Sequence, residues 1–355
     1  MVKRLICINV PIRVCNLKCG YCYLSQTGKW DLERKVFQYD TDHMVKAFSV
    51  ERFGGECLIN ITGVGETLMA PGIVEFIHGL LKQGHYIELV TNGTLSIRFQ
   101  ELSKIPARLL SKVMIKYSFH YRELTRLGLL DSFFENVKLM SKAGCSYTVE
   151  MVPEDELIPE IEEIKALCIK KLGAPCHLTI GRNDKKRGKD ILSRLNDSEY
   201  YKTWSTFDSS MFSYKWKLLG NKRREFCYAG AWSLYVNLAT GDAKSCYGQP
   251  VSQNIFKDLT EPVKFVPVGH YCTLPYCQNG HAFLTMGMIP GLEAPSYYDM
   301  RNRVRDDGTC WLSDDIKEAY TTKLYKCNVE YSVIRRAMHT VFYPFYAVFS
   351  WMRNS

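Results

Sequence analysis

The sequence has no uninterrupted apolar run that is long enough to cross a bilayer, and it has no secretory signal. The first apolar stretch, from Leu5 to Ile12, contains Asn9 and continues into Arg13 without a small-residue cleavage site. The apolar segment from Thr340 to Met352 is interrupted by Pro344 and is also too short. Internal repeats and low-complexity segments are missing as well. We therefore expect a cytoplasmic protein.

The sequence also has little local concentration of charge. Its 46 Lys and Arg residues and 37 Asp and Glu residues give a net charge of +9, and the basic residues are scattered along most of the chain. Such scatter argues against nucleic-acid binding and indicates attraction to an anionic substrate or surface. With 355 residues, 46% of them hydrophobic, the chain is long enough to bury a large core.

Short β-rich runs alternate with segments of helical periodicity in the first half of the chain. The expected strands are residues 4–10, 58–62, 86–91, 112–118, 146–151 and 176–181. The expected helices are residues 42–53, 72–82, 131–142 and 160–171. This alternation predicts an α/β fold with a parallel sheet, and six such units predict a partial (β/α)6 barrel of the TIM-like kind.

The alternation stops near Arg182, and the composition then changes. We expect a barrel core at 1–196, a bridging helix or linker at 197–225, a small module at 226–290 and a helical, aromatic extension at 291–355. Four spaced cysteines among many Gly and Pro residues indicate that a metal cluster organises the module. The aromatic tail is expected to pack on the protein or on a second subunit, with contact to a membrane surface as the alternative.

Three of the 14 cysteines, Cys15, Cys19 and Cys22, follow directly on the first expected strand. This position is the carboxyl end of the sheet, where barrel enzymes hold their active sites. Three thiolates can ligate three irons of a [4Fe-4S] cubane and leave the fourth iron open to another ligand. Because no histidine lies nearby in the sequence, the triad is a poor match for a tetrahedral zinc site.

The spacing of the triad, with Tyr21 before the last cysteine, resembles the signature of the radical S-adenosylmethionine (radical SAM) superfamily. The resemblance implies reductive cleavage of S-adenosylmethionine to a 5′-deoxyadenosyl radical, with an external electron donor such as flavodoxin or ferredoxin. It implies that a glycine turn ending in Glu66 binds the methionine amino group. His120 stands where the family often has an acidic residue, and it is either a ligand contact or a structural histidine. The cofactor-binding residues implied are Tyr21, Thr62, Gly63, Gly65, Glu66, Asn92 and Ser118.

The spacing of Cys227, Gly241 and Cys246 resembles the start of the auxiliary-cluster extension of radical SAM proteins, called SPASM in its long form and Twitch in its short form. The resemblance implies one auxiliary [4Fe-4S] cluster, and a strand pair turning at Thr240-Gly241 is expected within it. A zinc ribbon is the alternative for the same ligands. Cys310 and Cys327 could in principle complete a second cluster, but no other cysteines stand at a matching spacing. The four ligands implied are Cys227, Cys246, Cys272 and Cys277.

The auxiliary cluster favours an oxidation, and the start of the first strand near Arg4 favours a small-molecule substrate such as a sugar or nucleotide sugar. Peptide-modifying relatives commonly carry an amino-terminal leader-binding domain, for which this chain offers no room. A peptide maturase that forms a cross-link or an epimer is the first alternative, and a non-enzymatic metal-binding scaffold is the second. An anionic or lipid-linked substrate is compatible with the positive charge and the apolar tail.

Three polar residues near the ends of the fifth and sixth strands, Glu150, Arg182 and Asp184, are the candidate catalytic residues. Each could serve as a base or a substrate anchor, and surface ion pairing is the alternative.

An epimerase would also need a thiol that returns hydrogen from the other face of the substrate. Most cysteines outside the two clusters fall at the wrong end of the barrel, on a helix or, like Cys7, within a strand. This leaves Cys310 or Cys327 as the donor.

Overall fold

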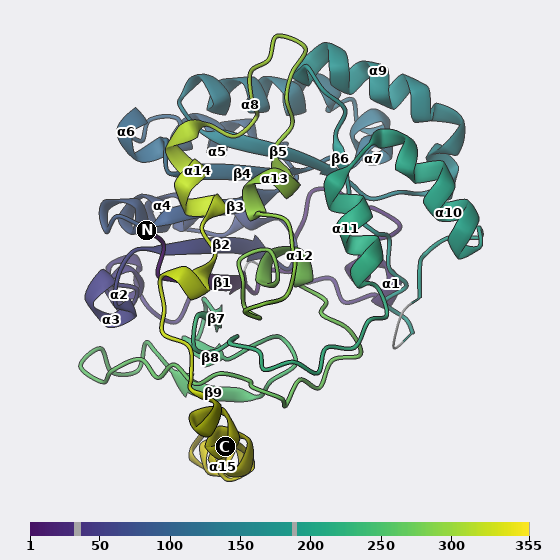
Figure 1. Cartoon of the computed structure of the whole chain (residues 1–355). Coiled ribbons are helices and arrows are strands. Elements are labelled where there is room, and N and C mark those ends of the chain that lie inside the picture. The colour runs from purple at the N-terminus through teal and green to yellow at the C-terminus, as the bar shows by residue number, and fades with distance from the viewer. Residues whose placement is uncertain (32–36, 187–189, 355) are drawn as a thin grey trace.

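A computed structural model describes residues 1–31, 37–186 and 190–354, with side chains up to Tyr343 in the last helix. Nine strands form one sheet in the order β6-β5-β4-β3-β2-β1-β7-β8-β9. Strands β1 to β7 pair in parallel, and β8 and β9 add an antiparallel edge (Figure 1). The strands are β1 (Arg4–Val10), β2 (Cys57–Gly63), β3 (Tyr86–Thr91), β4 (Val113–Ser118), β5 (Ser146–Met151), β6 (His177–Leu178), β7 (Ser233–Asn237), β8 (Asp242–Lys244) and β9 (Val251–Asn254).

Helices connect the parallel strands, and further helices follow in the second half of the chain. In the first part of the chain they are α1 (Tyr23–Thr27), α2 (Thr41–Ala47), α3 (Val50–Phe53), α4 (Ile73–Lys82), α5 (Ser96–Leu102), α6 (Ala107–Leu110), α7 (Tyr121–Arg126), α8 (Leu130–Lys142) and α9 (Ile161–Leu172). Later helices are α10 (Asp197–Trp204), α11 (Ser210–Leu218), α12 (Gly280–Phe283), α13 (Tyr297–Arg301), α14 (Asp314–Thr321) and α15 (Val333–Asn354).

The predicted α/β partial barrel is confirmed, and the differences have local causes. The sixth strand is shorter than expected, because the chain leaves the sheet to form an antiparallel bridge between Arg182 and Ile191. The expected helix 42–53 is divided, because Ser49 accepts a hydrogen bond from the amide of Arg52 and begins α3 anew. The bridging helix ends at Trp204, and the left-handed backbone of Asp208, with φ 47°, separates it from α11.

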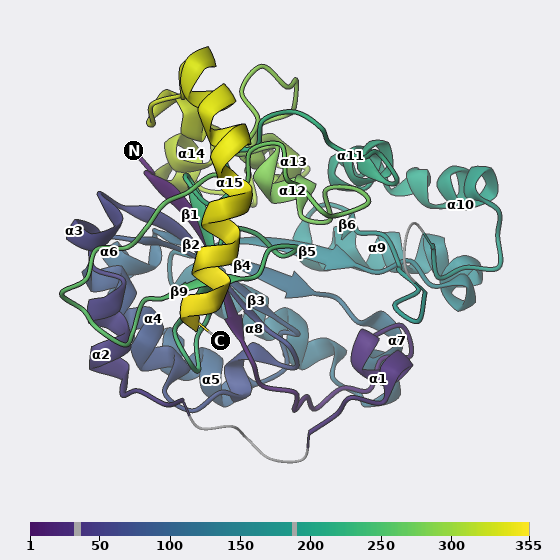
Figure 2. The ribbon, with the colours of Figure 1, turned by 90° about the horizontal axis from the view of Figure 1, so that it is seen from below.

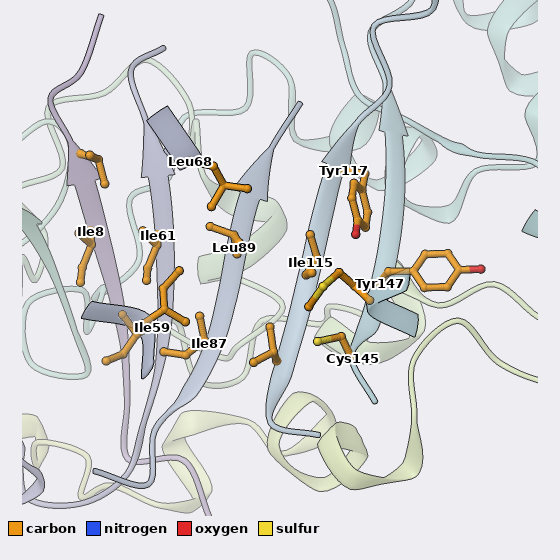
Figure 3. Close-up of a cluster of buried hydrophobic side chains, with 14 of the residues drawn as sticks. Ile8, Ile59, Ile61, Leu68, Ile87, Leu89, Ile115, Tyr117, Cys145 and Tyr147 are labelled. Atoms are coloured by element: carbon orange, nitrogen blue, oxygen red, sulfur yellow. The ribbon is translucent and has the colours of Figure 1, made fainter. Parts of the chain in front are cut away.

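The two faces of the sheet carry different side chains, as the two-residue period of strands requires. The outer face packs aliphatic residues such as Ile8, Ile61 and Ile115 against the barrel helices (Figure 3). Figure 2 shows α4, α5 and α8 on that side and α12 to α14 on the other. On the inner face, Leu5 and Met114 belong to a second core built largely by the carboxyl-terminal part of the chain.

The cysteine-bearing region is continuous with the barrel, because its first strand, β7, pairs in parallel with β1. The expected hairpin is present as β7 and β8, and Gly241 at its turn has a φ of 81°. An added Cβ at Gly241 would meet the ring of Phe256 at 2.5 Å. Tyr228 and Trp232 stack at 3.9 Å between ring centroids and belong to the inner core. The region 226–290 therefore shares a hydrophobic core with the barrel.

The last helix, α15, lies along the surface beside β9. His339 contacts the carbonyl oxygen of Pro267 at 2.9 Å, and Tyr343 donates to the Gln249 side chain at 3.2 Å. Ile334 and Val341 are exposed. Within the described residues, no helix has the length and apolarity needed to traverse a bilayer.

The segment between α13 and α14 is an integral part of the barrel wall. The Trp311 indole donates to the carbonyl oxygen of Leu172 at 3.0 Å and stacks on Tyr147 at 5.2 Å. Trp311→Ala should therefore lower the free energy of unfolding by about 3–5 kcal/mol, through the cavity and the lost packing. Urea unfolding followed by circular dichroism measures the change.

Ile97→Ala provides the control, because Ile97 is 73% exposed and its truncation should cost less than about 0.5 kcal/mol. Equal stability of the two variants would contradict this role of the extension.

Candidate active site at the carboxyl ends of the strands

The loop after β1 and the turn after β2 are held together by main-chain hydrogen bonds. The amide of Val64 donates to the carbonyl oxygen of Val10 at 3.0 Å, and the amide of Glu66 donates to that of Val14 at 2.9 Å. The amide of Gly65 lies between them and donates to Ile12. The segment that leads into the cysteine triad is thereby fixed against the glycine turn.

Gly65 is required in this turn by close backbone approach. A Cβ added there would lie 2.2 Å from the carbonyl oxygen of Val14, which is closer than any real Cβ contact. Gly63 is also confined, since its added Cβ would lie 2.9 Å from the backbone of Thr67. The glycines predicted from the sequence are thus explained by how tightly the turn meets the Cys15 loop.

The three cysteines of the triad line one cavity, which we call the cofactor cavity. It contains five of the predicted cofactor-binding residues, while Thr62 and Tyr21 line two neighbouring cavities. Burial raises the pKa of the Cys15 thiol to about 11. A thiolate here therefore requires a nearby positive charge, which the irons of a cluster supply. The five are Gly63, Gly65, Glu66, Asn92 and Ser118.

Glu66 is 2% exposed and is fixed by three hydrogen bonds. Its carboxylate accepts from the hydroxyl of Thr91 and the amide of Asn92, both at 2.7 Å, and from the amide of Leu68 at 3.0 Å. Burial raises its pKa, and these hydrogen bonds oppose that rise. The carboxylate is thus oriented at the wall of the cofactor cavity, where it can accept a hydrogen bond from an ammonium group.

Two further predicted residues position the triad. The amide side chain of Asn92 donates to Asn16 at 2.8 Å and contacts the sulfur of Cys15 at 3.6 Å. Tyr21 forms a short hydrogen bond with Nδ1 of His120. Burial lowers the pKa of His120 to about 4, so its imidazole is neutral at physiological pH.

The second cysteine group also surrounds one cavity, which we call the four-cysteine cavity. Cys227 is held by paired main-chain hydrogen bonds with Gly269, at 3.0 and 2.9 Å. Burial raises the pKa of Cys227 to about 12 and that of Cys246 to about 11. Cys310 and Cys327 do not line this cavity.

The four cysteines Cys227, Cys246, Cys272 and Cys277 all line the four-cysteine cavity. Four thiolates can hold a [4Fe-4S] cluster or a zinc ion, and iron and sulfide analysis distinguishes the two.

Between these two cysteine sites lies a third space, the middle cavity, of about 320 Å³. It shares Cys22 and His120 with the cofactor cavity and Cys277 with the four-cysteine cavity. Its apolar wall includes Val152, Ile180 and Leu218. A molecule in the middle cavity would therefore face both cysteine sites at once.

The predicted catalytic residues are placed differently from one another. Arg182 and Asp184 line the middle cavity. Glu150 forms a close ion pair with the buried Arg301. Burial alone would raise the pKa of Glu150, but Arg301 and the nearby Lys116 lower it to about 2. A carboxylate with such a pKa is a weak base, so this geometry favours the ion-pairing alternative for Glu150.

Sequence reasoning missed two residues that the structure brings to the site. Lys215 on α11 lines the middle cavity. Cys7 on β1 points to the inner face and lines an adjoining inner cavity, together with Lys116 and His281. Cys310 and Cys327, the thiols expected as hydrogen donors, line none of these cavities. The missed signal for Cys7 is its alternation with Ile6 and Ile8, which point to the outer core.

A partial barrel with a three-cysteine loop, a glycine turn and an acidic residue at the carboxyl ends of its strands defines an iron–sulfur protein that binds S-adenosylmethionine. The family model "Radical SAM superfamily" matches residues 9–168. Residues 9–168 therefore form a radical SAM domain, and the cysteine spacing that follows resembles the SPASM/Twitch extension. S-adenosylmethionine and [4Fe-4S] clusters, an auxiliary one included, are its cofactors.

Two curated relatives are similar in sequence. The antilisterial bacteriocin subtilosin biosynthesis protein AlbA of Bacillus subtilis (strain 168) is 26% identical over 271 residues, which are 72% of this chain and 58% of AlbA. GTP 3′,8-cyclase of Thermodesulfovibrio yellowstonii is 32% identical over 140 residues, which are 37% of this chain and 41% of the cyclase. The chain thus spans about half the length of these relatives.

One solved structure shares the fold, and a second matches slightly less closely. The structure of anSMEcpe with bound AdoMet and Kp18Cys peptide matches with a TM-score of 0.50 and 16% identity, over 72% of this chain and 78% of that chain. Streptococcus suis SuiB matches with a TM-score of 0.49 and 16% identity, over 72% of this chain and 64% of that chain. At such identity the likeness concerns the fold alone.

The close contact between the triad loop and the glycine turn gives a test of the cofactor cavity. Gly65→Ala should force the Val14 carbonyl and the triad loop apart, because of the 2.2 Å approach. We expect affinity for S-adenosylmethionine to fall at least about tenfold and the free energy of unfolding to drop by about 1–3 kcal/mol. Anaerobic equilibrium binding to the reconstituted protein measures the first effect.

Gly20→Ala is the matched control, because Gly20 lies inside the triad loop and an added Cβ meets nothing within 4 Å. Similar binding by both variants would show that the close approach is unimportant.

Proposed function

We propose that this protein is a radical SAM oxidoreductase that modifies a peptide substrate bound in the middle cavity. The observation that carries the proposal is the placement of this cavity, with Cys22 at one end and Cys277 at the other. A substrate carbon there would stand between the site of hydrogen abstraction and an electron acceptor. This arrangement supports an oxidation, either dehydrogenation or cross-linking.

The cluster held by Cys15, Cys19 and Cys22 supplies a 5′-deoxyadenosyl radical when S-adenosylmethionine is bound and an electron is delivered. The residues of this chain position and shield that chemistry. Glu66, oriented by Thr91 and Asn92, would hold the ammonium of the methionine moiety. The apolar wall of the middle cavity keeps water away from a reactive carbon.

The two possible substrate classes rest on different observations. The small-molecule interpretation rests on the expected position of the first strand and on the positive charge. AlbA, which takes part in the biosynthesis of a bacteriocin, is similar over 72% of this chain. Because a bacteriocin is a peptide antibiotic, this relative supports a peptide, our first alternative. A cavity of about 320 Å³ has room for one or two peptide side chains.

Two cysteine substitutions test the proposal. The reconstituted protein should hold about eight irons per chain and form 5′-deoxyadenosine with a reductant. Cys19→Ala should abolish 5′-deoxyadenosine. Cys277→Ala should lower the iron content toward about four per chain while 5′-deoxyadenosine is still formed, and no oxidised peptide should appear.

Iron and sulfide analysis, chromatography of the nucleoside and mass spectrometry of a peptide encoded beside the gene provide the readouts. The matched control is Cys310→Ala, because Cys310 is exposed and lines none of the cavities. Zinc in place of iron, or wild-type protein that leaves S-adenosylmethionine intact, would overturn the proposal.

A further inference from the structure

Lys215 is a largely buried ammonium group without a carboxylate partner. It projects from α11 into the middle cavity, where its Nζ donates to the hydroxyl of Thr179. Among the described residues, no carboxylate lies within ion-pair distance of Lys215. A buried ammonium is costly to the folded protein unless an opposite charge reaches it.

The two buried carboxylates that act on this region already have cationic partners. Glu150 is engaged by Arg301, and Glu88 forms an ion pair of 3.0 Å with Lys116. Glu88 also accepts a hydrogen bond from Asn60 at 2.7 Å and another from the phenol of Tyr297. Each carboxylate is therefore shared with another cation, and neither forms an ion pair with Lys215.

Positive charge is in excess around the cavity. The cations that act on one another there are Lys116, Arg182, Lys215 and Arg301, against the two buried carboxylates Glu88 and Glu150. Arg182 is exposed, so the less exposed groups are three cations against two carboxylates, which leaves an excess of one positive charge. Arg182 and Asp184 both line the cavity with exposed side chains, and water screens both of them.

Neutral groups also surround the middle cavity, and they do not offset its excess positive charge. Burial lowers the pKa of His281 well below its usual value, and the neighbouring cations lower it further, so its imidazole is neutral. Burial likewise lowers the pKa of Lys215 to about 7, although Glu150 acts in the opposite direction. An anion beside Lys215 would raise that pKa again and stabilise the ammonium.

We propose that Lys215, assisted by Arg182, binds a carboxylate of the substrate in the middle cavity, so that the peptide presents an acidic residue or its carboxyl terminus there. This inference rests on the proposed function for the identity of the substrate as a peptide. Lys215 would fix the substrate between the two cysteine sites through a charge-assisted hydrogen bond. It is a binding residue and takes no part in forming the radical.

Small model compounds test the proposal without turnover. The reconstituted protein with S-adenosylmethionine, and with no reductant, is titrated with N-acetylglutamate N-methylamide and with N-acetylalanine. The first carries a side-chain carboxylate and the second a terminal one. N-acetylglutamine N-methylamide is the uncharged match, and inorganic phosphate is the other anion. Saturation-transfer NMR measures the binding of each compound.

We expect at least one carboxylate to bind and the matched amide to bind at least about tenfold more weakly. Lys215→Met should weaken carboxylate binding at least about tenfold, and Lys215→Arg should retain most of it. Lys217→Met is the matched control, because Lys217 is exposed on the same helix, and it should bind like the wild type. Circular dichroism verifies that each variant is folded.

Equal binding of the carboxylates and the amide, binding of phosphate alone, or no binding by the wild type would overturn the proposal. Unchanged affinity in Lys215→Met would do the same. These outcomes are separate from a failure of the proposed function, which would appear as a wild-type protein that forms no 5′-deoxyadenosine when reductant is added.

Discussion

The pairing of β1 on both of its edges is the constraint on which the rest of the active site depends. β1 pairs in parallel with β2 over its whole length and with β7 over Leu5 to Asn9. One neighbour ends in the glycine turn, and the other opens the hairpin that leads to Cys246. Because hydrogen-bonded strands fix one another in register, β1 positions both cysteine groups. The radical SAM triad follows its carboxyl end, and the β7–β8 hairpin brings Cys246 level with its amino-terminal half.

The local features of this arrangement could be predicted from the sequence, because they depend on residues that are close together in the chain. Strand periodicity gave β1, β3 and β5 with correct bounds, and cysteine spacing identified the two groups. The pairing of β7 with β1 could not be predicted, since it joins segments far apart in sequence. The break between α10 and α11 at Asp208 could not be predicted either. An aspartate can adopt a left-handed backbone conformation, but the residues next to it in the sequence do not require one.

A weaker signal for the polar inner face of the sheet was present in the strands. Glu88, Lys116 and Glu150 each stand alone within an otherwise apolar or neutral strand. A single charged residue in a buried strand indicates that this face of the sheet meets a polar space, because an isolated charge in a dry core is too costly. The ends of the strands showed where the cofactor binds, whereas these central charges mark the polar interior beneath it. The position of Lys215 remained hidden, since it depends on how α11 packs against that interior.

The excess of cations around the middle cavity costs stability, and the outer core allows the chain to tolerate that cost. Arg301 illustrates this cost in stability, since its Nε and Nη2 are buried and have no hydrogen-bond partner. The large apolar outer core keeps the sheet in place even though its inner face carries like charges. A substrate that brings its own negative charge would remove part of the cost on binding, and a neutral competitor would not. Selectivity for an anionic substrate would then follow from the repulsion among cations in the free protein. No conformational change would be needed.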